Sequence, residues 1–260
     1  MITARSNSQL KQIAKLLRKR SEREEERVYV IEGRKMFFEV LEQAPELLEK
    51  AFWSQSGLSG LSEEEKALIS ACPYEEVSDD AFDSVAETVT PQGVLAIVKM
   101  PEYTPEELSK SGKNLLLLET LQDPGNLGTI LRTAEAAGIG GVILSSDSVD
   151  AFSPKTVRAT MGAVFRVPFV YVSDFPGTIA MLKENGYTIY AAHLKGSVPY
   201  DEPAYQGSCG ILIGNEGNGL SDEVTALSDV RIRIPMEGKA ESLNAGVAAA
   251  LMMYELRRHQ

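Results

Sequence analysis

Three segments rich in glycine and asparagine carry the polar side chains best suited to bind a ligand. The first runs from Thr120 to Glu135 and begins with the tight-turn sequence Asp-Pro-Gly-Asn at 123–126. Asn126 is of a type that caps helices, so a helix is predicted from about 127 to 137. Arg132 would then follow about 1.5 to 2 turns into it. A turn, a cap and a surface arginine would also explain these residues structurally.

The second segment, Gly214 to Ser221, has three glycines in six residues, in the pattern GxxGxG. Glycine allows positive φ and close approach of a ligand to the backbone. The pattern is not the GxGxxG of dinucleotide-binding proteins, and alone it indicates a simple turn equally well. Glu216 is the unusual member, because a flexible loop seldom needs a carboxylate at its centre.

The third segment, Pro235 to Leu251, brings the Ser242 hydroxyl and the Asn244 amide to the start of a helix predicted over 241–257. Gly246 costs about 1 kcal/mol in a helix relative to alanine, which favours close packing there. The run Ala248–Ala250 fits an ordinary interior helix as well.

Common catalytic patterns are missing from the sequence. His193 and His259 have no cysteine at zinc-ligand spacing, and no P-loop or GxSxG elbow occurs. The zinc-deaminase pattern is also missing. No metal site is therefore predicted.

The three segments follow predicted strands of one α/β domain. Apolar runs indicate strands at 115–118, 142–144, 169–172, 187–191, 211–213 and 230–234. Further helices fit from 153, at 176–185 and at 219–227. This alternation predicts a mostly parallel sheet covered on both faces. Ligands bind beyond the carboxyl ends of such strands, where all three segments lie.

A smaller α/β domain is predicted over 28–100. Strands are expected at 28–31, 51–54 and 93–100, with helices at 33–43, from Ser62 and at 79–86. An amphipathic helix within a basic arm, 1–27, precedes this domain, and 22–27 is predicted to be solvated. The polar, proline-containing stretch 101–113 is the expected linker to a domain spanning 114–260.

Composition is that of a globular protein: 260 residues, 43% hydrophobic, net charge −11. No membrane span or signal peptide is expected, and two cysteines favour a cytoplasmic location. Residues 1–20 hold six bases and no acid, so the remainder has 20 bases against 37 acids. The basic arm is either a solvated face or a contact for a polyanion.

Together the three segments resemble the signature motifs of the SpoU/TrmH family of RNA ribose 2′-O-methyltransferases, in the SPOUT superfamily. DPGNLGTILRTAEAAG (123–138), LIGNEGNGLS (212–221) and IPMEGKAESLNAGVAAALMMYE (234–255) carry the likeness. Residues 28–100 resemble the ribosomal-protein-like substrate-binding domain of many members. The third motif departs from the frequent SLNVSVA at Ala245 and Gly246, which predicts altered helix packing and retained catalysis.

The resemblance implies a deep trefoil knot, a homodimer with the active site at its interface, and S-adenosylmethionine (AdoMet) bound in the knot. Carried over by position, Gly214, Ile234 and Leu243 would contact AdoMet, with Met236 and Leu194 as further contacts.

The resemblance also implies catalytic roles. Arg132 would bind the substrate phosphate and the developing oxyanion, since arginine is a poor base. Glu216 would hold Arg132, with Asn126 as its alternative partner, while Asn126, Asn244 and Ser242 would orient groups. RNA-binding residues are expected as follows: Lys11, Lys15, Arg18, Lys19, Arg34, Lys35 and Arg158.

The expected reaction is methylation of a ribose 2′-hydroxyl, with 23S rRNA favoured over tRNA. The alternatives are a tRNA methyltransferase, an inactive RNA-binding scaffold, or a nicotinamide-dependent oxidoreductase. The last would need GxGxxG after the first strand, which is not present.

Overall fold

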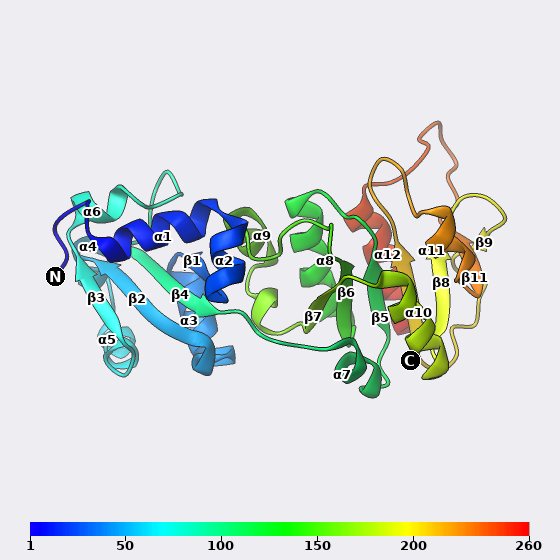
Figure 1. Ribbon diagram of the computed structural model, residues 1–260, viewed down its shortest axis with the longest axis horizontal. Coiled ribbons are helices and arrows are strands. Elements are labelled where there is room, and N and C mark those ends of the chain that lie inside the picture. The colour runs from blue at the N-terminus through cyan, green and yellow to red at the C-terminus, as the bar shows by residue number, and fades with distance from the viewer. Residues whose placement is uncertain (260) are drawn as a thin grey trace. The chain divides into compact units, whose positions relative to one another are not determined.

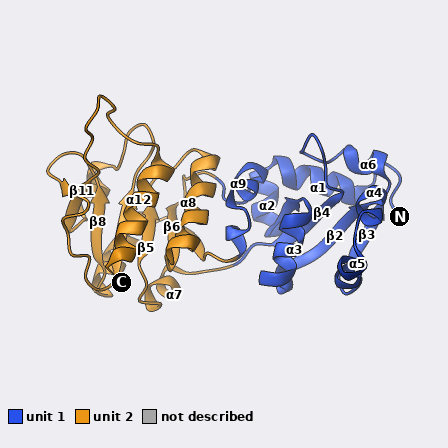
Figure 2. Cartoon of the chain, turned by 180° about the vertical axis from the view of Figure 1, so that it is seen from behind, with its two compact units in different colours: residues 1–101, 150–165 blue, residues 102–149, 166–260 orange. Residues whose placement is uncertain are grey.

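The computed structural model describes residues 1–259, which form two compact units (Figures 1 and 2). Unit 1 comprises residues 1–101 and 150–165, and unit 2 comprises residues 102–149 and 166–260. The chain therefore leaves unit 1, begins unit 2, returns to unit 1 and then completes unit 2.

Unit 2 is built on a seven-stranded sheet in which every neighbouring pair is parallel. The strand order is β7-β6-β5-β10-β8-β11-β9. The strands are β5 (Leu115–Leu118), β6 (Gly141–Ser145), β7 (Phe169–Val172), β8 (Thr188–Ala192), β9 (Val198–Pro199), β10 (Cys209–Ile213) and β11 (Val230–Arg233). The central strands β5, β6 and β10 are buried throughout, which explains their continuous apolar sequences.

Helices cover both faces of this sheet. Helices α8 (Pro124–Ala137) and α12 (Ala245–Arg258) lie on one face, and Figure 2 shows them side by side. Helices α7 (Pro105–Lys110), α10 (Phe175–Glu184) and α11 (Asp222–Ala226) supply Leu108, Ile179 and Val224 to the core on the other face. The α/β class predicted from the sequence is confirmed.

Unit 1 is a smaller α/β layer structure. Its sheet has the order β1-β4-β2-β3, formed by β1 (Val28–Glu32), β2 (Leu48–Ser54), β3 (Tyr74–Val77) and β4 (Val94–Lys99). Strand β4 is antiparallel to both its neighbours, and β2 is parallel to β3. The helical segments are α1 (Ser8–Arg18), α2 (Arg20–Glu26), α3 (Arg34–Gln43), η1 (Pro45–Leu47), α4 (Gln55–Ser59), α5 (Glu63–Ser70), α6 (Asp79–Asp83), α9 (Pro154–Thr160) and η2 (Ala163–Phe165).

The basic N-terminal segment is an integral part of unit 1. Leu10, Ile13, Leu16 and Leu17 of α1 are buried in the core with β1 and α6, and its basic side chains point to solvent. The predicted amphipathic helix is confirmed. Removal of residues 1–20 would also remove this part of the core.

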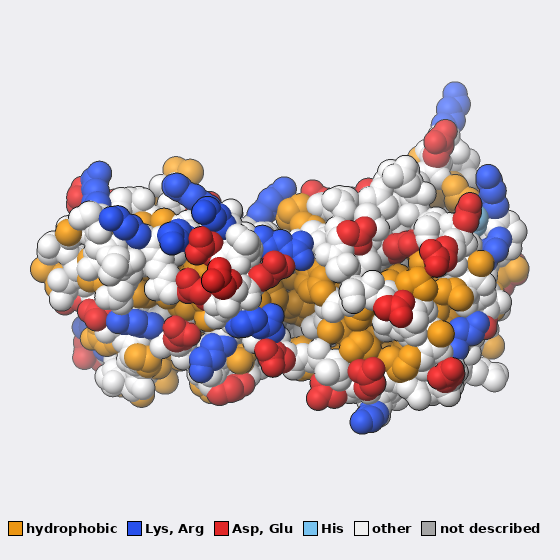
Figure 3. All heavy atoms as spheres, in the orientation of Figure 1, with side chains coloured by type: hydrophobic (Ala, Val, Ile, Leu, Met, Phe, Trp, Pro, Cys, Tyr) orange, Lys and Arg blue, Asp and Glu red, His pale blue; other side chains and the backbone are white. Residues whose placement is uncertain are grey.

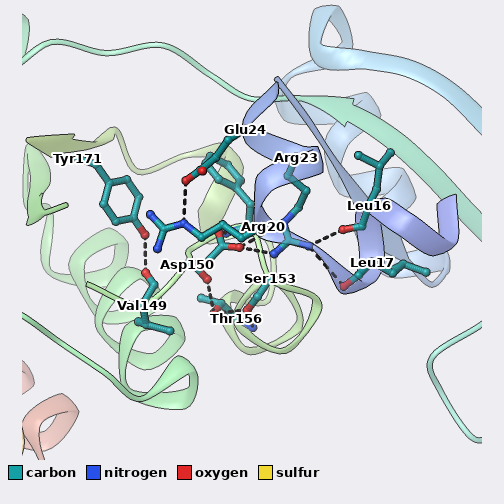
Figure 4. A network of polar contacts seen from close by, with 11 residues as sticks. Leu16, Leu17, Arg20, Arg23, Glu24, Val149, Asp150, Ser153, Thr156 and Tyr171 are labelled. Carbon is teal, nitrogen blue, oxygen red and sulfur yellow. Dashed lines mark hydrogen bonds and ion pairs between the residues drawn. The ribbon is translucent and has the colours of Figure 1, made fainter. Parts of the chain in front are cut away.

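A buried ion pair fastens α2 to the segment that returns to unit 1. The Arg23 guanidinium bonds to the Asp150 carboxylate, with Nε 3.2 Å from Oδ2, and their side chains are 5% and 13% exposed. Arg23 also donates to the carbonyls of Leu16 and Leu17 (Figure 4). The prediction of a solvated charged run at 22–27 is therefore wrong at Arg23.

Several predicted boundaries differ from the structure. Asp123 caps α8, accepting from the Asn126 backbone N–H at 2.8 Å, so Asn126 lies inside the first turn. Helix α12 begins at Ala245 and α11 at Asp222, later than predicted. The predicted linker 101–113 contains α7, and 150–165 lies in unit 1 although it was assigned to the 114–260 domain. Strands β3 and β9 and helix α4 were not predicted.

Candidate functional site

A chain of side-chain hydrogen bonds joins the three polar segments of unit 2. The Glu216 carboxylate accepts from Asn126 Nδ2 at 2.9 Å and from the backbone N–H groups of Gln122 and Asp123, each at 3.0 Å. Asn126 Oδ1 in turn accepts from Asn244 Nδ2 at 2.8 Å. Residues about 90 and 118 positions apart along the chain are thus brought together.

Asn244 links this chain to the start of α12. Its Oδ1 accepts from the N–H groups of Gly246 at 3.0 Å and Val247 at 3.3 Å, which makes it the N-cap. A Cβ on Gly246 would lie 3.4 Å from Thr129 Cγ2 of α8. That distance is an ordinary van der Waals contact, so packing against α8 does not itself require glycine here, contrary to the prediction of close packing.

Glu216 is a fixed, ionised carboxylate. Burial disfavours its charge, but the bonds from Asn126, Asp123 and Gln122 outweigh burial and lower its pKa below the ordinary value. Its oxygens are occupied by these donors, so it is poorly placed to accept a proton. The expectation that Glu216 holds Arg132 is not met: the alternative partner, Asn126, occupies the carboxylate.

Arg132 lies on α8 with an exposed side chain. Within residues 1–259 its guanidinium makes no hydrogen bond or ion pair with the protein, so all its donors are available. It is also not among the residues that line the cavity described next.

A cavity of about 670 Å³ opens at the carboxyl ends of β8, β10 and β11. All five residues predicted to contact a cofactor line it: Leu194, Gly214, Ile234, Met236 and Leu243. Glu216 and Ser242 also line it, whereas Asn126, Arg132 and Asn244 do not. The volume of the cavity and its lining of both apolar and polar residues are typical of a site for a small molecule.

Gly214 forms one wall of the cavity where the chain turns sharply. Asn215 and Gly219 exchange backbone bonds of 3.0 and 2.9 Å, which closes a short hairpin over residues 215–219. A Cβ on Gly214 would lie 2.1 Å from the carbonyl carbon of Gly219, so no other residue fits. The glycine pattern here thus has a steric cause.

Sequence reasoning missed a set of polar groups behind this site. Thr120 adopts φ 53°, which is rare for a β-branched residue. Its N–H donates to Ser145 Oγ at 2.8 Å and its Oγ1 to Asp147 Oδ2 at 2.9 Å, while its carbonyl accepts from Asn215 Nδ2 at 2.9 Å. The signal was available: Ser145 to Ser148 follow a strand that neighbours β5, at the same sheet edge.

The residues predicted to bind RNA have varied surroundings within unit 1. Lys11, Lys15, Arg18, Lys19 and Lys35 are exposed. Arg34 is engaged: its Nη2 lies 2.6 Å from both Glu65 oxygens, and Nη1 donates to the Gly60 carbonyl at 3.1 Å. Arg158, on α9, has a buried Nη1 without a partner among the described residues.

Residues 1–259 contain neither a candidate membrane helix nor a candidate metal-binding cluster. None of their helices is both long and apolar enough to cross a membrane. No group of three or more histidine, cysteine or acidic side chains among them is arranged to hold a metal ion.

Residues 113–254 match the model of the SpoU rRNA Methylase family, and residues 7–96 match that of the MRM3-like substrate binding domain. The chain belongs to the SpoU rRNA methylase family. A relative from Bacillus subtilis, 23S rRNA (guanosine(2553)-2′-O)-methyltransferase RlmP, is 41% identical over 181 residues, covering 70% of this chain and 71% of the relative. The resemblance inferred from the motifs is confirmed.

Solved SpoU-type structures extend the similarity to nearly the whole chain. An AdoMet-bound rRNA methyltransferase from Sinorhizobium meliloti is 32% identical, with a TM-score of 0.86 over 99% of this chain and 97% of that one. AviRb from Streptomyces viridochromogenes, a SpoU methyltransferase in complex with AdoMet, is 25% identical, with a TM-score of 0.84 over 97% and 98%. Both solved structures share the fold of this chain over nearly its whole length.

Proposed function

We propose that this SpoU-family protein transfers the methyl group of AdoMet to a ribose 2′-hydroxyl of ribosomal RNA. One observation carries the proposal: the Glu216–Asn126–Asn244 chain joins all three motif segments beside a cavity of about 670 Å³. A dinucleotide-binding oxidoreductase would not need this arrangement.

The cavity suits AdoMet. Leu194, Ile234, Met236 and Leu243 offer apolar surface, and Gly214 leaves its backbone accessible. When bound there, AdoMet supplies a methyl group on a positively charged sulfonium. We further propose that residues 234–244 and α12 form the family's trefoil knot, since they pass from β11 back to the α8 face of the sheet.

The residues of the chain would position and stabilise the attacking group. The Arg132 guanidinium offers several N–H donors in one plane, so it serves as a bidentate donor to the substrate phosphate and the developing oxyanion. Because Glu216 already accepts three N–H groups, it holds Asn126 and the 122–126 turn in place. The hydroxyl proton then passes to an acceptor on the substrate side, such as the adjacent phosphate. Ser242, on the cavity wall, would orient the hydroxyl or AdoMet.

A second copy of the chain would complete the site. The exposed face of α12 carries Val247, Leu251 and Tyr254, which are 47%, 38% and 48% exposed and recur at helical spacing. An exposed apolar stripe of this kind favours a protein interface. Arg132, on the neighbouring helix α8, does not line the cavity of its own protomer, which a homodimer with shared sites would explain.

Ribosomal RNA is favoured over transfer RNA because the relative RlmP is named for 23S rRNA. The basic face of α1, with Lys11, Lys15, Arg18 and Lys19 exposed on unit 1, would contribute to RNA binding, as would Lys35. Such a role would place the protein in the cytoplasm with its substrate.

Methyl mapping tests the proposal. Ribosomal RNA from a strain lacking the gene should miss one 2′-O-methyl site, and the purified protein with tritiated AdoMet should restore it. A missing site in tRNA would support the tRNA alternative. Binding of AdoMet and RNA without methyl transfer would support an inactive scaffold, and binding of NAD in place of AdoMet would refute the assignment.

A further inference from the structure

Four basic residues gather on the wall of the cavity that β8 and β11 form. His193 follows β8, and its N–H donates to the Ile232 carbonyl of β11 at 2.9 Å. Arg231 and Arg233 flank the buried Ile232, so they share one face of β11. Lys195 completes the set, which we term the basic rim: His193, Lys195, Arg231 and Arg233 all line the cavity.

The members of the basic rim lie close together. A Cβ on Gly196 would be 3.7 Å from Arg231 Nη1, so the guanidinium lies over the segment next to Lys195. Arg233 Nη1 donates to the Ser197 carbonyl in the same segment. The backbone N and O of Lys195 are 3.2 and 3.0 Å from His193 Nδ1. Figure 3 shows basic side chains along the edge of unit 2 where β9 and β11 lie.

The charge of the basic rim is not neutralised within the protein. Over residues 1–259, none of its four members forms an ion pair with a carboxylate. Three acidic residues also line the cavity. The Glu216 carboxylate accepts hydrogen bonds from Gln122, Asp123 and Asn126. Asp222 lies on α11 and Glu241 in the 234–244 segment, and neither forms an ion pair with the basic rim. In a chain of net charge −11, the charges of Lys195, Arg231 and Arg233, which form no ion pair with the described residues, are a local exception that suits an anion.

The geometry points to the phosphates of RNA as that anion. We propose that the basic rim binds the phosphate groups flanking the target ribose, an assignment that rests on the proposed function. A ribose 2′-hydroxyl lies between the phosphates of its own nucleotide. When that hydroxyl reaches a methyl donor inside the cavity, those phosphates must therefore stand at the cavity wall or mouth. Cations there neutralise them and fix the position of the strand.

The positive charges of the basic rim could also bind the carboxylate of AdoMet. The test therefore distinguishes binding of RNA phosphates from binding of the AdoMet carboxylate. The variant is K195Q/R231Q, since these two side chains are exposed and make no hydrogen bond with the described residues. The matched control is K110Q/K113Q, which removes two exposed charges from unit 2 that do not line the cavity. Unmethylated ribosomal RNA from the deletion strain is the probe.

Loss of two phosphate contacts should weaken RNA binding about tenfold and lower the slope of log Kd against log salt by about 1.4, at about 0.7 per contact. The KM for RNA should rise similarly, while kcat and the Kd for AdoMet stay within twofold of the wild type. Control and wild type should agree. An unchanged slope, or a tenfold weaker Kd for AdoMet with normal RNA binding, would overturn the proposal. Filter binding measures the Kd for RNA and its salt dependence even if the wild-type protein transfers no methyl group. Absence of methyl transfer would count against the proposed function and not against RNA binding by the basic rim.

Discussion

Thr120 Oγ1 donates to Asp147 Oδ2 at 2.9 Å, and this bond holds a residue of positive φ at the start of the first polar segment. Ser145 Oγ donates to Asp147 Oδ1 at 2.6 Å, and the Ser145 hydroxyl oxygen in turn accepts the Thr120 N–H at 2.8 Å. Beyond Thr120, the N–H groups of Gln122 and Asp123 reach Glu216. The position of Glu216 and Asn126 therefore depends on a conformation that Asp147 enforces.

Removing one acceptor at Asp147 should loosen this turn. For D147N we expect kcat to fall about tenfold, which corresponds to about 1.4 kcal/mol and lies at the low end of the cost of a hydrogen bond left unmade. The Kd for AdoMet should stay within twofold, because Asp147 does not line the cavity. T120S keeps the hydroxyl and should retain activity, whereas T120V should behave like D147N. Equal activity of T120S and T120V would refute this role.

Acid should erase the contribution of Asp147 to stability. Its hydrogen bonds from Ser145 and Thr120 outweigh desolvation and lower its pKa. A lowered carboxyl pKa stabilises the fold above the unfolded value of about 3.9 and loses that effect as pH falls through the folded value. Urea unfolding should therefore separate wild type from D147N at pH 7, and the two curves should converge as the pH falls below about 3.9. A difference that grew on acidification would contradict the assignment.

Arg132 is expected to act in catalysis and not in AdoMet binding. R132A should lower kcat by about 10²–10³, as loss of an oxyanion donor does. R132K should be nearly as impaired, because a point charge cannot replace the planar fork. Calorimetric binding of AdoMet should be unchanged in both, since Arg132 does not line the cavity. R258K, on a base that bonds to Glu255, is the control and should remain active.

Gly214, just before the 215–219 hairpin, and Gly217 within it should respond differently to the same change. G214A places a methyl group 2.1 Å from the Gly219 carbonyl carbon, so the hairpin must open and AdoMet binding should be lost. At Gly217 the nearest atom to an added Cβ is Asn215 Oδ1 at 3.5 Å, so G217A should bind AdoMet nearly normally. Titration calorimetry on both variants is decisive. Normal binding by G214A would mean that this wall is not the AdoMet site.

Breaking the buried pair of unit 1 should be costly. R23M leaves Asp150 buried without its counter-charge, for which about 3–5 kcal/mol of unfolding free energy is expected to be lost. Trp53, the single tryptophan, is fully buried in unit 1 and reports its unfolding in urea by fluorescence. R5A, which breaks the exposed Arg5–Asp80 pair, should leave the midpoint unchanged. Equal effects of both substitutions would argue against the buried pair.

The sequence predicted the central strands β5, β6 and β10 of unit 2 well because their burial on both faces leaves continuous apolar runs. Strand β3 was missed because Glu75 and Glu76 interrupt any apolar pattern. Its extended conformation is stabilised by parallel pairing with β2, a contact that the local sequence does not indicate. The site segments were found from their place after strands and from the family resemblance.

Long-range partners account for the errors in the site. Asn126 is a sound cap by type, but Asp123 takes that role and frees the Asn126 amide for Glu216 and Asn244. Burial of Arg23 depends on Asp150, 127 positions away, which a charged run gives no reason to expect. Tertiary contacts decide which residue caps α8 and whether Arg23 is buried, and local sequence propensity does not distinguish these alternatives.

The return of residues 150–165 to unit 1 sets an order for biosynthesis. When the ribosome has made residues 1–101, Arg23 still has no counter-charge and β1 lacks the cover of α9. Unit 1 can be finished only after β5, α8 and β6 have been made, so the nascent chain must hold two incomplete units at once. Residues 1–101 expressed alone should then fold poorly, even though the match to the MRM3-like substrate binding domain ends at residue 96.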